Sequence, residues 1–479
     1  MSTAPKSFRI AFGWSLVQHW GARAISFLVF FVLARLLSPS DFGLVALSSI
    51  VIGFTEIFID QGFSDAVVQS HDDSEQYLST AFWVNIFTAL ALMLVVLFGA
   101  NSIASVFKEP RLVLITRVLS ITFLFTALSS VQIALLRRKL DYRSLAIRTT
   151  LANLISGTVA ITMALVGFGV WSLVVQQIVF GAVSMIVVWR VGVFRLSRQV
   201  DWASFRQLMH FGLKVCGVRT VDLLHTKLID SLVGIYLGAV VLGIYAVGTR
   251  LGLILMQLLG TSIADVSLAH FSDLRRAGGD ISAAYLKMLR RLALTSVPLF
   301  TYLALESRPL VHILFGHKWD DSAPIFAAFC GAGIVQVLIY FSNSAISALG
   351  RPGLQLVMSL IKLALYVGGF YIYVSHGIAA IAWSMTGVTV LVIAPISFAI
   401  VGRLLRFPMA ALVRRLLLPY SCVSVAAAMA YMTARYCPPL SVLSLIASTV
   451  AFFGTFLACC LATDPDARAL GFRLLRTKV

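Results

Sequence analysis

Charged side chains occur inside long apolar segments of this sequence, and their chemistry is the clearest guide to what the protein does. The cations in such segments are Arg23, Arg117, Arg219, Lys227, Arg250 and Lys362, and the acids are Glu56, Asp60, Asp222 and Asp230. A charge at the centre of a bilayer costs about 3 kcal/mol or more unless it faces a cavity or a partner. Because the cations outnumber the acids, a cavity that they line would favour an anion. Guanidinium groups bind phosphate oxygens through paired hydrogen bonds, so these six cations are candidates for binding a phosphate-bearing headgroup.

The densest group of these charges lies between positions 210 and 236. Arg219, Asp222, Thr226 and Asp230 follow at i, i+3, i+7 and i+11, which places them on one helix face with Lys227 beside it. One interpretation is that this face lines a substrate cavity. The other is that Arg219 pairs with Asp222, and Lys227 with Asp230, as structural ion pairs. The sequence leaves both open.

The remaining charges are more isolated. Arg23 has no acid at helical spacing, which favours a cavity-lining role, and Lys362 is close to the middle of its apolar segment. Arg117 is nearer a segment end, where a long side chain can also extend to the membrane surface. Glu56 and Asp60 are spaced i, i+4, and two neighbouring carboxylates in a low dielectric repel, so one of them is expected to hold a proton at neutral pH. We therefore expect Glu56, Asp60, Asp222 and Asp230 to be the candidates for ion coupling.

Motifs of catalysis and of metal binding are not found in the sequence. It has no phosphate-cradling G-x-x-x-x-G-K-[ST], no H-E-x-x-H and no G-x-S-x-G. Two acidic pairs, Asp72-Asp73 and Asp320-Asp321, lie in short polar gaps and are interpreted as solvated loops. The six cysteines show no metal-ligand spacing. We expect no catalytic residue, no cofactor, no metal and no structural disulfide.

Composition places the chain in a membrane. Of 479 residues, 59% are hydrophobic and 12% charged, with a mean hydropathy of +0.93, whereas about a quarter of a soluble domain is charged. The formal net charge of +18 raises the question of nucleic acid. The basic residues form short clusters between apolar runs, however, which is typical of a membrane protein and not of a nucleic-acid surface.

Apolar runs of about 20 residues predict an all-α integral membrane protein with about 14 transmembrane helices. The expected helices lie near 11–34, 43–61, 79–100, 112–136, 147–167, 170–190, 210–236, 241–264, 288–307, 323–348, 354–374, 377–401, 416–434 and 440–461. If both termini are cytoplasmic, the inside gaps carry about 26 Lys and Arg against about 6 outside, as the positive-inside rule requires. The apolar stretch after Lys6 and Arg9 is too long for a signal peptide, so we interpret it as a retained first helix.

An internal repeat organises these helices. Phe42-Gly43, Ala46 and Asp65 recur as Leu242-Gly243, Ala246 and Asp265, at a constant offset of 200 residues. Two six-helix lobes, 1–195 and 196–403, are therefore expected, related by a pseudo-two-fold axis along the membrane normal, with a substrate site between them. Residues 404–479 form an extra helix pair and a basic cytoplasmic tail. Pro298 and Pro395 interrupt two later helices and allow them to bend.

The start of the chain resembles a known family. Residues 34–46 read ARLLSPSDFGLVA and residues 60–69 read DQGFSDAVVQ. This segment resembles the Wzx-type polysaccharide and lipopolysaccharide exporters, particularly the colanic-acid exporter branch, of the multidrug/oligosaccharidyl-lipid/polysaccharide (MOP) exporter superfamily. The resemblance is specific at the N-terminus and extends over most of the chain as helix count and repeat pattern.

This resemblance implies a flippase of the bacterial inner membrane that moves undecaprenyl-pyrophosphate-linked oligosaccharide repeat units from the cytoplasmic to the periplasmic leaflet. It also favours a monomer. It further implies that Arg23 lines the central cavity, that the last two helices form a groove for the lipid tail, and that polysaccharide polymerase and export machinery are partners. The alternative within the same superfamily is an ion-coupled multidrug or small-molecule antiporter. A sugar-polymerising membrane enzyme would be expected to have a long periplasmic loop, and a scaffold would not require buried charges.

Overall fold

A computed structural model describes residues 21–60, 62–69, 74–192, 197, 200–351, 353–436 and 440–463. Within these ranges every regular element is an α-, 3-10 or π-helix. The chain divides into two compact units, Met1–Ala246 and Val247–Val479. The all-α class expected from the apolar periodicity is confirmed.

The first unit contains a series of long apolar helices joined by short connections. They are α2 (Ala22–Leu36), α3 (Pro39–Asp60), α4 (Phe63–Gln69), α5 (Glu75–Phe107), α6 (Leu112–Leu119), α7 (Thr122–Arg138), α8 (Tyr142–Leu165), α9 (Val170–Val191) and the first arm of α10 (Trp202–Arg276). Side-chain caps define several starts: Ser74 accepts a hydrogen bond from the Tyr77 amide, and Asp141 accepts one from the Ser144 amide.

Helix α10 is bent at Gly238. This glycine has φ 83° and ψ 176°, a backbone conformation that is essentially restricted to glycine, so the helical path breaks there without a loop. The two helices expected at 210–236 and 241–264 are thus the two arms of α10. The boundary between the two units falls on the second arm, after Ala246.

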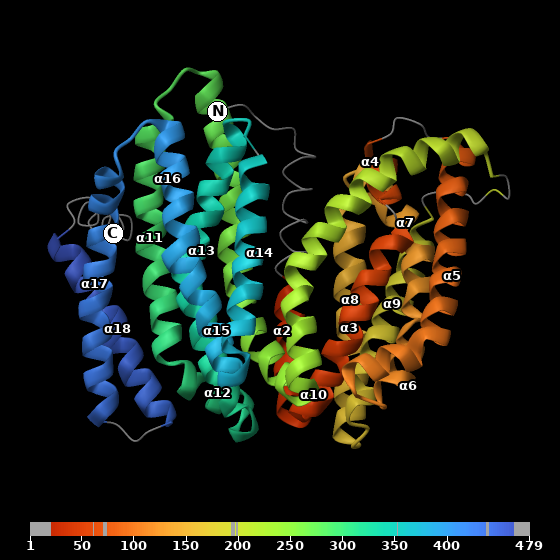
Figure 1. Ribbon diagram of the computed structural model, residues 1–479, viewed down its shortest axis with the longest axis horizontal. Helices are drawn as coiled ribbons and strands as arrows, with labels where there is room; N and C mark the ends of the chain where they lie inside the picture. The colour runs from red at the N-terminus through yellow and green to blue at the C-terminus, as the bar shows by residue number, and fades with distance from the viewer. Residues whose placement is uncertain are drawn as a thin grey trace, which may run out of the picture. The chain divides into compact units, whose positions relative to one another are not determined.

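The first arm of α10 closes one end of the first unit. Figure 1 shows this arm, in yellow-green, arching across the ends of α4, α5 and α7. Leu208 of α10 is fully buried there, in an apolar cluster with Phe63, Tyr77 and Leu135. The apolar side chains therefore fix the end of α10 that carries the charged face described below.

Two glycines lie at the crossing of α3 and the second arm of α10, each against the backbone of the other helix. A Cβ atom on Gly43 would overlap the carbonyl of Ala239, and a Cβ atom on Gly243 would overlap the carbonyl of Pro39. Each pair is displaced from the other by the 200-residue offset of the repeat. Residues 39–43 and 239–243, which correspond at the 200-residue offset, therefore cross with backbone against backbone.

The second unit packs around the long apolar helix α13. Its elements after α10 are α11 (Ile281–Leu305), α12 (Ser307–Phe315), η2 (His317–Ser322), α13 (Ala323–Ala348), α14 (Gly353–Tyr373), η3 (Val374–His376), α15 (Ile378–Gly387), η4 (Val388–Ile393), α16 (Ala394–Leu405), α17 (Met409–Tyr436) and α18 (Val442–Thr463). Helices α11, α15 and α16 contact α13. Pro298 lies within α11, and Pro395 follows the π-helical segment η4.

The last two helices form a pair on one side of the second unit. Figure 1 shows α17 and α18, in blue, side by side next to α11, and both helices contact α11. The hydroxyl of Tyr302 on α11 hydrogen-bonds that of Thr449 on α18, and Phe452 and Phe453 pack against its ring. The predicted extra pair is thus attached through α11.

Eleven helical segments of the described residues are long and apolar enough to cross a membrane. The expected spans 11–34 and 288–307 are not among them, and the expected spans 210–236 and 241–264 are represented by one segment, Thr226–Met256. Helix α11 begins with Lys287, Arg290 and Arg291, which lower its hydropathy, and α2 begins at Ala22 because residues 1–20 lie outside the described ranges. The chain is a multi-pass membrane protein, and the count of fourteen stays a prediction, as does the lobe division at 195.

Candidate functional site

Arg219 bridges two carboxylates of the first unit. Its guanidinium donates one hydrogen bond to Asp60 Oδ2 at 3.0 Å and another to Asp65 Oδ2 at 2.6 Å. The other carboxylate oxygen of Asp60 accepts hydrogen bonds from the hydroxyl and the amide of Ser64. The charges sum to one negative, so the acids more than neutralise the arginine. We call Asp60, Asp65 and Arg219 the α3–α4–α10 triad.

A glycine allows α10 to come close enough to form this triad. Gly62, between α3 and α4, has φ +75°, and a Cβ atom there would lie 2.6 Å from Cβ of Val215. Val215 and Arg219 are spaced i, i+4 and share one face of α10. The face that carries Arg219 therefore packs directly over the turn between the two acids.

This arrangement differs from the pairing of Arg219 with Asp222 considered from the sequence. Arg219 pairs with acids more than 150 positions earlier in the chain, and its pairing with Asp222 stays a prediction. The side chain of Asp222 lies outside the described part of the structure. Lys227 does pair with Asp230, with its Nζ 3.2 Å from the carboxylate, as the ion-pair interpretation predicted. Two of the six candidate cations are thus neutralised by acids.

Glu56 and Asp60, which lie one turn apart on α3, differ in their contacts. Asp60 is engaged by Arg219 and Ser64, and its side chain is only 13% exposed. Glu56, one turn earlier on α3, makes no hydrogen bond or ion pair with any residue that the structure describes. Among the described residues, therefore, the Glu56 carboxyl has no hydrogen-bond or ion-pair partner, whereas that of Asp60 has several.

The other cations of the first unit differ in their surroundings. Arg23 lies in the first turn of α2 and has no hydrogen-bond or ion-pair partner among the described residues. The nearby His19 and Gln18 lie outside them. Arg117 on α6 donates from Nε to the carbonyl of Leu97 on α5 at 3.1 Å, which links these two helices. Arg117 thus has a structural contact, whereas none is found for Arg23 within the described ranges.

Lys362 is the centre of a polar network in the second unit. Its Nζ donates to Gln336 Oε1 at 2.9 Å and lies 5.3 Å from the centre of the Tyr366 ring. The Tyr366 hydroxyl hydrogen-bonds Thr389 at 2.7 Å, on the π-helical segment η4. All of these partners are neutral, so the charge of Lys362 has no counter-ion among the described residues. Arg250 belongs to the second arm of α10 and is exposed.

Sequence reasoning missed the neutral members of these groups and one acid. Asp65 appeared there only as a marker of the repeat, and Ser64, Gln336, Tyr366 and Thr389 were not singled out. Polar side chains inside predicted spans are a usable signal, since such groups hydrogen-bond across helices. Asn85 of α5 is one example, because its amide donates a hydrogen bond to the Ser130 hydroxyl of α7 at 2.9 Å.

The fold of this chain is also found in solved membrane transporters. The chain superposes on a solved lipid II flippase MurJ in its inward closed conformation with a TM-score of 0.76, at 13% identity, over 95% of this chain and 99% of that one. It superposes on an inward-facing multidrug resistance MATE family transporter of the MOP superfamily with a TM-score of 0.60, at 14% identity, over 82% and 98%. The chain thus shares its fold with both of these proteins.

Sequence comparison identifies the family to which the chain belongs. A model of the polysaccharide biosynthesis protein family matches residues 32–324, and the chain belongs to this family. Curated relatives include the teichuronic acid biosynthesis protein TuaB of Bacillus subtilis (strain 168), 27% identical over 69% of each chain. Others are the succinoglycan biosynthesis transport protein ExoT of Rhizobium meliloti (strain 1021), at 25% over 65% of this chain and 63% of that one, and the lipopolysaccharide biosynthesis protein WzxC of Escherichia coli (strain K12), at 22% over 70% and 69%. The resemblance noted at residues 34–69 is thereby confirmed.

Proposed function

We propose that this protein is a flippase that translocates undecaprenyl-pyrophosphate-linked oligosaccharide repeat units from the cytoplasmic to the periplasmic leaflet. The units would serve exopolysaccharide or O-antigen biosynthesis, and the protein would act as a transporter and not as an enzyme. Family membership, relatives named for polysaccharide biosynthesis and transport, and the fold shared with a lipid II flippase support this proposal.

The observation that carries the proposal is a cation within a spanning helix that has no counter-ion in the part of the chain that the structure describes. Lys362 is surrounded by neutral partners among the described residues, although an uncompensated charge in a membrane is costly. A pyrophosphate supplies the missing negative charge, and Gln336 and Tyr366 can hydrogen-bond sugar hydroxyls or phosphate oxygens. Arg23, without a described partner, and Arg250 are proposed as further headgroup contacts.

The remaining candidates require an exchange of partners. Arg219 and Lys227 are paired with acids, and Arg117 binds a backbone carbonyl. For these cations to contact the headgroup, the anionic substrate would have to displace the existing contact. We therefore assign them a secondary role, in which binding of pyrophosphate competes with Asp60, Asp65 or Asp230.

Transport is proposed to proceed by alternating access, with the prenyl chain remaining in lipid. Helices α17 and α18 would guide this chain, because they form a separate pair that contacts α11. Glu56 is the leading candidate for ion coupling, since its carboxyl has no described partner, and Asp60, Asp222 and Asp230 are secondary. We further propose a bacterial inner-membrane location, cytoplasmic termini and a monomer that works beside polysaccharide polymerase and export machinery.

Reconstitution tests this function directly. Liposomes would carry the full-length protein and a fluorescent undecaprenyl-pyrophosphate oligosaccharide, and an impermeant quencher would report the fraction of label on the outer leaflet. We expect protein-dependent translocation that Arg23→Ala strongly reduces and Arg23→Lys largely retains. Normal translocation by a correctly folded Arg23→Ala protein would remove Arg23 from the proposed site. Absence of translocation by the unmodified protein would overturn the flippase proposal.

A drug antiporter is the second candidate, because the chain also shares the fold of a multidrug MATE transporter. Such a transporter would bind organic cations, which the unneutralised Lys362 would repel. A deletion strain separates the two functions: a flippase predicts loss of surface polymer with unchanged drug sensitivity. Increased drug sensitivity with intact polymer would favour the antiporter.

A further inference from the structure

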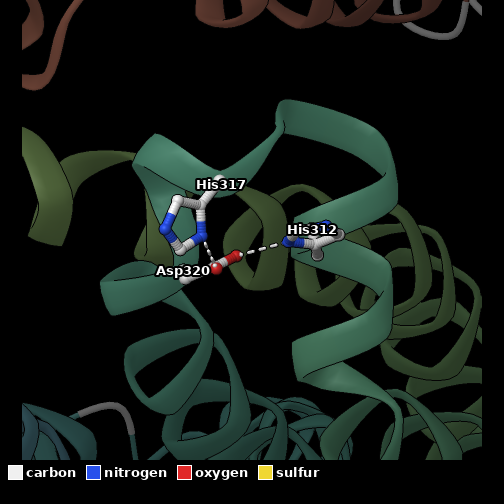
Figure 2. A group of neighbouring side chains, drawn as sticks. All are labelled: His312, His317 and Asp320. Atoms are coloured by element: carbon white, nitrogen blue, oxygen red, sulfur yellow. Dashed lines mark hydrogen bonds and ion pairs between the residues drawn. The ribbon is translucent and has the colours of Figure 1, made fainter. Parts of the chain in front are cut away.

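Three side chains that can ligate metals meet in the second unit, on helices that carry none of the charged groups described above. They lie on the segment that joins α11 to α13, where α12 ends at Phe315 and η2 begins at His317. Figure 2 shows His312 from α12 and His317 from η2 on either side of the Asp320 carboxylate.

The contacts within this cluster are short. His312 Nδ1 lies 3.0 Å from Asp320 Oδ1, and His317 Nδ1 lies 2.5 Å from Asp320 Oδ2. One potential ligand atom from each of the three residues lies within 4.8 Å of the others. Four tetrahedral ligands at about 2.0–2.2 Å from Zn²⁺ are themselves about 3.3–3.6 Å apart. Only small side-chain movements would therefore be needed to place an ion among the three atoms.

The backbone holds these side chains together for reasons independent of any hydrogen bond between them. Gly316 has φ 90° and ψ 170°, and it turns the chain between α12 and η2. Trp319, next to Asp320, is fully buried and anchors η2, and its amide hydrogen-bonds the carbonyl of Gly316. The turn and the anchored tryptophan fix the positions from which the three side chains converge.

We propose that His312, His317 and Asp320 bind a divalent transition-metal ion, with Zn²⁺ as the physiological example. Two imidazole nitrogens and one carboxylate oxygen are the ligand types that such ions prefer, and Cu²⁺ binds such sets more tightly than Zn²⁺. With both imidazoles neutral the cluster carries one negative charge, which attracts a cation. Three protein ligands leave a fourth position for water.

Ion entry is favoured by the exposure of one ligand. The His317 side chain is 90% exposed, whereas those of His312 and Asp320 are 32% and 19% exposed. His317 can thus move aside and return over the bound ion. Binding through Nδ1 requires that the proton of each neutral imidazole reside on Nε2. The present hydrogen bonds to Asp320 are then replaced by two metal–nitrogen bonds and one metal–oxygen bond. Neutral histidines release no net proton in this exchange.

Cu²⁺ is the sharpest spectroscopic probe of this proposal. Full-length protein without a polyhistidine tag would be titrated with Cu²⁺ in detergent, and electron paramagnetic resonance would count the coupled nitrogens. We expect one ion per chain with two nitrogen ligands, reduced to one nitrogen in His317→Ala. His376→Ala is the matched control, because His376 is an exposed histidine on η3 of the same unit, and it should leave the spectrum unchanged.

Zn²⁺ affinity provides the second measurement. Competition with a chromophoric chelator should show a stoichiometric site whose affinity falls more than about tenfold in His312→Ala, His317→Ala and Asp320→Asn. Because the His317 side chain is exposed, we expect its alanine variant to fold normally, and gel filtration checks this. A spectrum or affinity that is unaltered in His317→Ala, or a protein that binds no Cu²⁺ or Zn²⁺ at micromolar concentration, would overturn the proposal. Lipid flipping is measured separately, so failure of one proposal leaves the other intact.

Discussion

Arg219 of α10 forms an ion pair with Asp60 of α3 at 3.0 Å, across 159 positions of sequence. The same guanidinium reaches Asp65 at the start of α4, so one side chain ties together three helices of the first unit. Asp60 is largely buried, and removal of its cation would leave a carboxylate charge without compensation in poorly solvated surroundings.

Removal of this arginine should lower stability. We expect Arg219→Ala to cost about 1–3 kcal/mol, less than for a fully buried pair because the Arg219 and Asp65 side chains are about a third exposed. Asp60→Asn in the Arg219→Ala background should recover part of this loss, because the unpaired charge is removed. Thermal unfolding in detergent measures both. Arg276→Ala is the control, because its pair with Asp273 is exposed and should contribute almost nothing.

The crossing of α3 and α10 should tolerate no side chain at either glycine. Gly43→Ala and Gly243→Ala each place a Cβ atom against a backbone carbonyl, which cannot move aside as a flexible side chain can. We expect a loss of about 3 kcal/mol or more, or a protein that fails to accumulate. Gly99→Ala on α5 is the control, because that Cβ meets no atom within 4 Å. Accumulation in membranes and gel-filtration profiles provide the comparison, and well-folded Gly43→Ala protein would show that the helices are farther apart.

The charge of Lys362 should matter more to transport than to folding. Lys362→Met removes one charged hydrogen-bond donor, worth about 1.5–3 kcal/mol, so we expect translocation of the lipid-linked oligosaccharide to fall about tenfold or more. Lys362→Arg should retain most of the rate. The unfolding temperature of Lys362→Met should stay equal or rise, because an uncompensated charge has been removed from a span. A large fall in stability with unchanged transport would indicate a purely structural lysine.

The start of α10 should weaken at low pH. Asp201 accepts hydrogen bonds from the amide and hydroxyl of Ser204, and hydrogen bonds from Ser204 lower the pKa of the Asp201 carboxyl. A lowered folded-state pKa means that the stabilisation is complete above the unfolded pKa of about 3.9 and is lost as the pH falls through the lower folded value. Hydrogen exchange at the first amides of α10, corrected for intrinsic rates, should therefore lose protection as the pH falls below about 4. Asp201→Asn should show no such transition in this pH range.

Much of the fold follows from local properties of the sequence. Apolar runs set the helices, and the gap expected between 236 and 241 contains the bend at Gly238, because glycine accepts the required dihedral angles. The partners of Arg219 could not be predicted in this way. Helical spacing identifies only neighbours on the same helix, whereas Asp60 and Asp65 reach Arg219 through the packing of α10 over the turn at Gly62.

The two polar groups of the second unit show the same limit. Lys362 was recognised as an intramembrane charge, but its neutral partner Gln336 lies on another helix, 26 residues away. His312, His317 and Asp320 are close in sequence, yet their spacing matches no familiar metal motif. A turn at Gly316 and a buried Trp319 bring them together, and neither effect is visible in residue spacing alone.

The reciprocal placement of Gly43 and Gly243 also bears on how such a chain could arise. Gly43 touches Ala239, and the residues at the corresponding repeat positions, Gly243 and Pro39, touch each other in the same way. Reciprocal contacts of this kind form between two identical subunits around a two-fold axis. A half-length ancestor could have made the same contact twice as a homodimer, and gene fusion would then have preserved it within one polypeptide. At this crossing the backbone of each segment leaves no room for a side chain at the glycine of the other. We therefore expect both positions to have remained glycine while the two halves diverged elsewhere.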